Sequence, residues 1–144
     1  YHVERMRILD FYLLFPCQLP SFRFPRPLMR QRKTFAGRNN RYEKLADPYR
    51  IFLRLAPFQQ EAFGCLAAHG LINPVRLAEG MVARTDASLP ARLKATAEEA
   101  DRLASDVIDL LTGPLKDIDL YGKAGLKARS DLFEYRYDPV QTIS

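Results

Sequence analysis

The chain has 144 residues, of which 47% are hydrophobic, and its formal net charge is +5. This length suits one domain with a buried core. The apolar run at residues 8–15 is much shorter than the roughly 20 residues that a helix needs to cross a bilayer, so we expect no membrane contact. Cys17 and Cys65 are too few and too far apart for a disulfide framework, and the first residues do not resemble a signal peptide. These features together favour a protein of the reducing cytoplasm.

The first predicted helix covers residues 4–15 and ends before Pro16. From Ile8 to Phe15 only Asp10 carries a charge, and a helix that is apolar on nearly every face is buried on nearly every face. Because the ends of chains usually fray, we expect this helix to be covered either by the rest of the domain or by a partner protein.

Most of the excess of positive over negative charge lies between residues 21 and 44. The first fifty residues hold eleven basic and four acidic side chains, whereas the rest of the chain holds eleven and thirteen. Four prolines within residues 16–27 disfavour a regular helix and favour extended chain, with Phe22 and Phe24 in the core, and a short basic turn or helix is expected over 28–35. Such a basic cluster attracts phosphate or an acidic protein surface, although a solvated loop has the same composition.

Two helices are predicted between residues 48 and 69. Asp47 would cap the first N–H groups of one helix and Pro48 suits its first turn, and this helix is expected to end at Pro57. Pro57 then opens a second helix, which Gly70 ends as a C-terminal cap.

A short connector leads from this second helix to the strand-like segment 81–85. A helix followed by a small β-wing is the typical end of a winged-helix domain, a fold that binds DNA in many proteins and docks other proteins in many others. We therefore predict a mainly α fold with a small β element, in which residues 1–87 form a winged-helix-like core that includes the basic segment 21–44.

Residues 88–112 carry the clearest helical pattern. Ser88 is the expected N-cap, Pro90 lies in the first turn, and Gly113 ends the helix. Seven residues follow the 4-3-4-3 spacing of an a/d seam, so this long amphipathic helix is expected either to pack on its own domain or to form a coiled-coil-like contact with another chain. The seam consists of Leu89, Leu93, Thr96, Ala100, Leu103, Val107 and Leu110.

The remaining residues, 113–144, are expected to form a C-terminal extension of the same single domain, 1–144. Within them, Phe133, Tyr135 and Tyr137 alternate with charged residues, which suits a half-buried strand.

Catalytic signatures are weak in this sequence. A Walker A loop needs a glycine five residues before its Gly-Lys pair and a Ser or Thr after it. Gly122-Lys123 is preceded by Asp117 at the first position and followed by Ala124, so the chain is not itself a P-loop ATPase. We expect no enzymatic activity and assign no catalytic residue.

Cys65 and His69 are the best pair of candidate metal ligands, because they lie at i and i+4 on one predicted helix face. Zinc needs three or four ligands, and only Cys17 and His2 remain among the soft ones. We therefore expect neither a metal nor another cofactor.

Four ordered segments carry a resemblance to a known family. They are Arg5–Pro16 (RMRILDFYLLFP), Leu19–Lys33 (LPSFRFPRPLMRQRK), Asp47–Pro74 (DPYRIFLRLAPFQQEAFGCLAAHGLINP) and Glu79–Thr85 (EGMVART). In this order they resemble the middle-component family of ABC-three-component systems, small subunits encoded beside an SMC-like ABC ATPase, as in Lamassu-type bacterial defence operons. The resemblance covers about residues 5–95, and none of its segments is a catalytic signature.

The resemblance implies a non-enzymatic adaptor held on the SMC-like ABC ATPase, which would sense invading DNA, while a third subunit, often a nuclease, acts as effector. The basic segment would then contact double-stranded DNA without reading its sequence, or an acidic partner surface. The apolar N-terminal helix would dock on the ATPase, although each of its residues could instead belong to the core. The residues expected to contact DNA or an acidic partner are Arg26, Arg30, Arg32, Lys33 and Arg38, and those expected to dock on the ATPase are Leu9, Phe11, Tyr12, Leu13 and Phe15.

A stand-alone winged-helix transcription regulator is the alternative function. It would need a recognition helix that offers polar side chains to base edges, and a symmetric dimer. The helix predicted over 57–69 offers Gln59, Gln60 and Glu61 but no Arg or Lys, so the sequence favours the adaptor.

Overall fold

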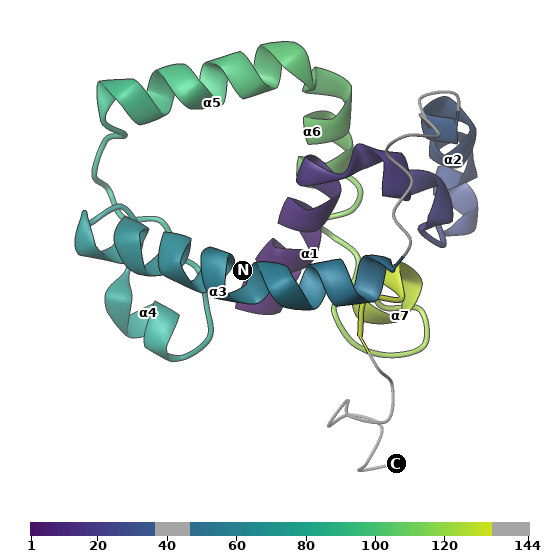
Figure 1. Cartoon of the computed structure of the whole chain (residues 1–144), viewed down its shortest axis with the longest axis horizontal. Helices are drawn as coiled ribbons and strands as arrows, with labels where there is room; N and C mark the ends of the chain where they lie inside the picture. The colour runs from purple at the N-terminus through teal and green to yellow at the C-terminus, as the bar shows by residue number, and fades with distance from the viewer. Residues whose placement is uncertain (37–46, 134–144) are drawn as a thin grey trace.

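A computed structural model describes residues 1–36 and 47–133 of the chain, and the regular elements within these ranges are helices (Figure 1). Two isolated β-bridges join His2 to Met81 and Ile72 to Arg84. Within the same ranges, no helix combines the length and the apolar character needed to cross a membrane. In chain order the elements are α1 (Val3–Leu14), the 3₁₀ helices η1 (Pro16–Ser21) and η2 (Arg26–Leu28), α2 (Met29–Ala36), α3 (Pro48–Ala68), α4 (Pro74–Ala78), α5 (Ala91–Leu103), α6 (Ser105–Thr112) and α7 (Leu126–Ser130).

The core forms around one side of α1. Phe11 and Tyr12 are buried on that side, and α1 packs against η1, α3, α6 and α7. The rings of Phe11 and Phe52 meet edge to face with their centroids 5.9 Å apart, and those of Tyr12 and Phe22 do so at 5.6 Å. Such pairs contribute about 0.5–1.5 kcal/mol each beyond the area they bury. The first predicted helix is thus confirmed, and so is the placement of Phe22 and Phe24 in the core.

The opposite side of α1 is left open by this core. Leu13 and Leu14 keep 38% and 53% of their surface exposed, and Met6 and Leu9 are half-buried. The described domain therefore covers only one side of a helix whose sequence is apolar nearly all round.

Arginines hold the segment after α6 against the N-terminal part of the chain. The guanidinium of Arg5 donates hydrogen bonds to the backbone carbonyls of Lys116 and Ile118, at 2.6 and 2.5 Å. Arg23, one of the residues of the basic segment, forms an ion pair with Asp131 at 3.0 Å. Because much of this segment lies outside helices, its carbonyls need donors from elsewhere in the chain. Part of the N-terminal positive charge therefore serves the fold.

The described residues do not support the winged-helix-like core predicted for residues 1–87, nor its small β element. The predicted strand divides its backbone hydrogen bonds between two neighbours: the amide of Val82 donates to the carbonyl of Tyr1, and that of Thr85 to the carbonyl of Leu71. Each neighbour lies within a few residues of a helix end, so neither is long enough to pair as a strand. Within the described residues, single bridges replace the expected wing.

The two helices predicted on either side of Pro57 are one helix, α3. Its start and end follow the sequence signals, since the Asp47 carboxylate accepts a hydrogen bond from the amide three residues later and Gly70 follows the last turn with a φ of +72°. Pro57 removes the hydrogen bond that would reach the carbonyl of Leu53. Both residues are exposed, so water can serve that carbonyl and the helix continues.

The long helix predicted over 88–112 is broken at Ala104 into α5 and α6. Ala104 leaves the helical region, with φ −134° and ψ 37°, and α6 begins at Ser105 with Asp106 in its first turn, where a negative charge interacts favourably with the helix dipole. The break divides the predicted seam. Its last residues, Val107 and Leu110, lie in the core, whereas no residue of α5 is buried.

The proline-rich segment 16–27 contains 3₁₀ turns rather than extended chain throughout, because the φ angle that proline fixes also suits the first turn of a helix. The basic turn or helix predicted over 28–35 is confirmed as α2. Of the predicted C-terminal strand, Tyr135 and Tyr137 lie outside the described residues.

Replacing Phe52 with Ala is expected to lower the free energy of unfolding by about 3–5 kcal/mol, because its ring is fully buried and contacts Phe11 and the guanidinium of Arg7. Urea denaturation of the free chain measures this value. Phe58→Ala removes the same side chain from the same helix, where 71% of it is exposed, and should change the free energy by no more than about 0.5 kcal/mol. Equal losses in the two variants would contradict this assignment of the core.

Candidate functional site

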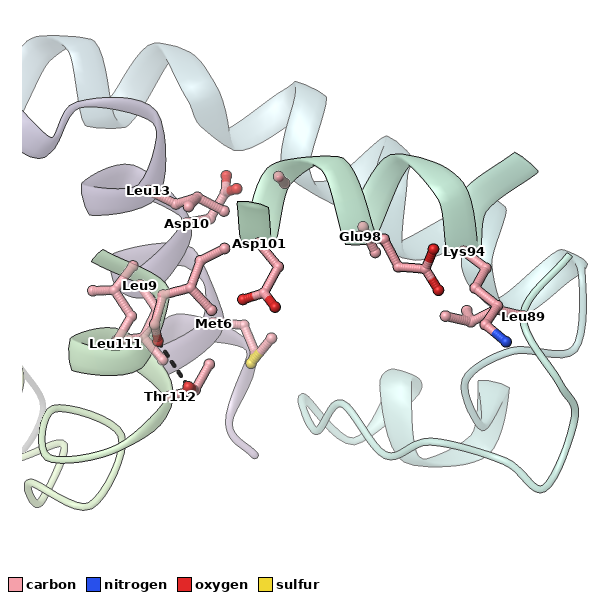
Figure 2. Close-up of a pocket in the computed structure, with 13 residues that line it drawn as sticks. Met6, Leu9, Asp10, Leu13, Leu89, Lys94, Glu98, Asp101, Leu111 and Thr112 are labelled. Atoms are coloured by element: carbon pink, nitrogen blue, oxygen red, sulfur yellow. Dashed lines mark hydrogen bonds between the residues drawn. The ribbon is translucent and has the colours of Figure 1, made fainter. Parts of the chain in front are cut away.

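A cavity of about 670 Å³ opens between α1, α5 and α6 (Figure 2). One wall consists of Met6, Leu9, Asp10 and Leu13 of α1, which follow one another at i, i+3, i+4 and i+7. This spacing aligns side chains along one helix face over two turns. The cavity between these three helices, called the groove from here on, therefore runs along the side of α1 that the core leaves open.

The opposite wall of the groove belongs to α5 and repeats the same spacing. Lys94, Ala97, Glu98 and Asp101 follow one another at i, i+3, i+4 and i+7, and Ala100 adds a small side chain beside them. Two helices thus line the groove, and Figure 2 shows them nearest to each other at Asp101, from which α5 runs away from α1 toward Lys94. Between them, α6 closes it with Ile108, Leu111 and Thr112.

α5 has little packing of its own within the described chain. None of its thirteen residues is buried, and Leu103 keeps 70% of its surface exposed. Figure 1 shows α5 along one edge of the molecule, joined through α6 at one end and through a loop at the other. Helices draw most of their stability from packing an amphipathic face, and one of this length is marginal in water alone. The apolar side of α5, with Leu93, Ala97 and Ala100, therefore lacks a cover among the described residues.

A second cavity, of about 590 Å³, lies between α3 and the start of α5. Leu93 lines it from α5, and Leu66, Cys65 and His69 line it from α3. Cys65 and His69, the candidate metal ligands, thus share this cavity, but within residues 1–36 and 47–133 no three His, Cys, Asp or Glu side chains are grouped so as to hold a metal ion. The second cavity extends the open surface along α5.

Among the residues that line this mainly apolar groove, carboxylates outnumber ammonium groups, although the chain is basic overall. Asp10, Glu98 and Asp101 line it together with one described basic side chain, Lys94. Figure 2 shows Asp101 at the end of α5 nearest to α1, with Glu98 and Lys94 following along the helix. The carboxylate of Asp10 accepts a hydrogen bond from the amide nitrogen of Gln59 at 2.8 Å, which fixes its position in the wall.

Buried polar contacts hold the α1 wall against α3. Gln59 is buried and accepts a hydrogen bond from Nε of Arg7 at 2.8 Å. Burial lowers the pKa of Arg7 from its ordinary value, and the carboxylate of Glu4 acts in the opposite direction.

Burial also raises the pKa of Tyr12 far above its ordinary value, and Asp131 adds to this rise. Tyr12 is therefore neutral at physiological pH and contributes packing.

The residues predicted to dock on the ATPase divide between the groove and the core. Leu9 and Leu13 line the groove, although Leu9 also packs against the core, and for both residues docking stays a prediction. Phe11 and Tyr12 point to the other side of α1 and are buried in the core of the chain itself, so a partner cannot reach them in this fold. Phe15 is half-buried and packs on the same core.

α5 and α6 contribute groove residues that the docking prediction missed. The available signal was the 4-3-4-3 seam over 88–112, for which contact with another chain is one of the two interpretations. The break at Ala104 could not be read from that seam, and it is the break that leaves Ala97 and Ala100 facing the groove.

The residues predicted to contact DNA gather on α2 and the turn before it. Four of the five are exposed, and no ion pair to any of them forms within the described part of the chain. α2 is anchored through Phe35, which is buried, and packs on η1. The fifth residue, Arg38, lies outside the described residues. The four exposed residues are Arg26, Arg30, Arg32 and Lys33.

A family model described as ABC-three component (ABC-3C) system Middle Component 5 matches residues 1–138, nearly the whole chain. The chain is therefore an accessory component of an ABC-three component defence system. More narrowly, it belongs to the Middle Component 5 family. No curated protein and no solved structure matches it. Neither this family nor a described fold without a wing favours the stand-alone winged-helix regulator.

Proposed function

We propose that the chain is a non-catalytic adaptor of a Lamassu-type bacterial defence complex directed against phages and plasmids. In this proposal it docks on an SMC-like ABC ATPase in the cytoplasm and couples that ATPase to an effector subunit, a nuclease. The observation that carries the proposal is the exposure of α5. This thirteen-residue amphipathic helix has no buried residue, and it forms one wall of an apolar groove.

Docking of the ATPase in the groove would cover the apolar side chains that the described chain leaves exposed there. Leu9 and Leu13 of α1 and Leu93 near the start of α5 leave apolar surface open to water, and covering such surface stabilises a complex by roughly 25 cal/mol per Å². Contiguous apolar surface of this kind on a small protein marks a site of interaction. The adaptor would thus complete its own packing when it binds the ATPase, which gives the interaction a physical driving force.

Replacing Leu13 with Asp is expected to abolish binding to the ATPase, because it places a charge in the apolar wall of the groove next to Asp10. Co-purification of the two proteins after co-expression measures binding, and circular dichroism checks that the variant is folded. Leu14→Asp is the matched control, since Leu14 is the more exposed of the two residues and does not line the groove. A folded Leu13→Asp variant that still co-purifies with the ATPase would refute docking through the groove.

A second role, contact with DNA held on the ATPase, is supported by the exposed basic side chains of α2. Arg and Lys contacts to phosphates position DNA without reading its sequence, which suits a complex that must respond to any invading DNA. The lack of ion pairs to these side chains within the described chain keeps their charge available to a ligand. An acidic surface of a partner protein would use the same charges and is the competing interpretation.

Replacing Arg30, Arg32 and Lys33 together with Ala is expected to weaken DNA binding by the assembled complex and to make its salt dependence shallower, by about 0.9 in the log–log slope for each lost phosphate contact. Fluorescence anisotropy with duplex DNA at several salt concentrations measures the slope. Arg54→Ala combined with Lys123→Ala removes exposed charge elsewhere and should leave the slope unchanged. If the α2 variant also keeps the original slope, its side chains contact protein or solvent instead.

A further inference from the structure

We infer that the groove receives an α-helix of the partner, and that this helix carries Lys or Arg beside its apolar stripe. The inference rests on the proposed docking function and adds the form and the charge of the segment that docks. Three features of the groove carry it: the arrangement of its walls, the small side chains of α5, and its charge.

The walls of the groove are shaped for a helix. The lining residues of α1 and those of α5 both follow the spacing i, i+3, i+4 and i+7, so each wall presents a stripe about two turns long. Helices pack by placing such stripes against the stripes of a neighbour. An occupant with its own apolar positions at i, i+3, i+4 and i+7 would lay this stripe along one wall and meet the other wall and α6 where α5 comes nearest to α1, at Asp101 (Figure 2).

The α5 wall allows this occupant to approach closely. Ala97 and Ala100 lie next to each other on the groove side of α5, and the distance between packed helix axes falls as the side chains at the contact become smaller. The larger apolar side chains, Met6, Leu9 and Leu13, stand on the α1 wall. We therefore place the backbone of the partner helix nearer to α5 and its large apolar side chains against α1.

The charge of the groove selects a basic helix. Three carboxylates, those of Asp10, Glu98 and Asp101, share the lining with the single ammonium group of Lys94 among the described residues. Asp10 is held in this wall by its hydrogen bond from Gln59. Complementary charges at the edge of an interface speed association, whereas like charges reject wrong partners. The same acidic groups disfavour DNA in the groove, which separates this site from the basic side chains of α2.

Photo-crosslinking within the complex tests the form of the occupant. A benzophenone amino acid is placed at Lys94, in the α5 wall, and as a matched control at Arg102, a basic residue of the same helix that does not line the groove. The complex with the co-expressed ATPase is irradiated, and mass spectrometry locates the linked residues. We expect links from position 94 to a single helix of the ATPase, at positions three or four residues apart, flanked by Lys or Arg.

Other outcomes of the crosslinking overturn the inference in different ways. Links from position 94 to a loop or strand refute a helical occupant, links to a second copy of this chain replace the partner with self-association, and links from position 102 alone move the interface to the outer face of α5. If wild-type chain and ATPase form no complex at all, the proposed docking function fails and the inference falls with it, whereas an intact complex without links from position 94 refutes the inference alone.

Charge reversal tests the second part of the inference. Glu98→Lys combined with Asp101→Lys should raise the dissociation constant for the ATPase by about tenfold or more and reduce its salt dependence, because it sets like charges against the basic helix. Glu99→Lys is the matched control on the other face of α5, where Glu99 pairs with Arg102 at 2.7 Å, and should change the constant by less than about twofold. Equal effects of the two variants, or tighter binding by the groove variant, would refute a basic partner helix.

Discussion

Packing of Phe11 on Phe52 links the core of this protein to its groove. The two rings meet edge to face with their centroids 5.9 Å apart and fix α1 against α3. On the same pair of helices, the guanidinium of Arg7 lies 4.4 Å from the centre of the Phe52 ring and donates to Gln59, and Gln59 donates in turn to Asp10 in the wall of the groove. The contact that builds the core therefore also sets the position of an acidic group at the candidate site.

The packing of one side of α1 determines what its other side can do. Because the aromatic side chains pack in the core, Leu9 and Leu13 line the groove beside the Asp101 end of α5. α5 is joined to α6 through the single non-helical residue Ala104. Stability is concentrated in the core around α1, α6 and the arginine-bound segment near Asp131, while α5 relies on little packing within the described chain. Elements that move or bind are commonly drawn from the less stable parts of a fold, and the groove fits that rule.

Local signals in the sequence predicted α1, α2 and the two ends of α3, and tertiary contacts account for the failures. Asp47 and Gly70 mark the two ends of α3, as expected from the capping side chain of one and the backbone freedom of the other. The helix continues past Pro57 because Leu53 and Pro57 are exposed, and this exposure is a property of the folded chain. The expected wing failed because a strand needs a partner of its own length, which the segments around Tyr1 and Leu71 are too short to provide.

The candidate site was predictable only in part for a related reason. The sequence of an apolar helix such as α1 predicts that the helix is buried, but it does not show which face meets the core and which meets a partner. Phe11 and Tyr12 in the core therefore could not be distinguished from Leu9 and Leu13 in the groove. The α5 wall depended on the break at Ala104, where no proline or glycine marks the end of a helix. The exposure of the basic side chains of α2, by contrast, follows from their residue type, because Arg and Lys are mostly exposed, and their contact with DNA stays a prediction.

Hydrogen exchange of the α5 backbone amides, compared between the free chain and its complex with the ATPase, tests the central claim most directly. If α5 lacks packing of its own and gains it from a partner in the groove, its amides exchange fast in the free chain while those of α1 and α6 are protected, and they become protected in the complex. If the α5 amides are already as protected as those of α6 in the free chain, or remain unprotected in an intact complex, the groove is not where the partner docks.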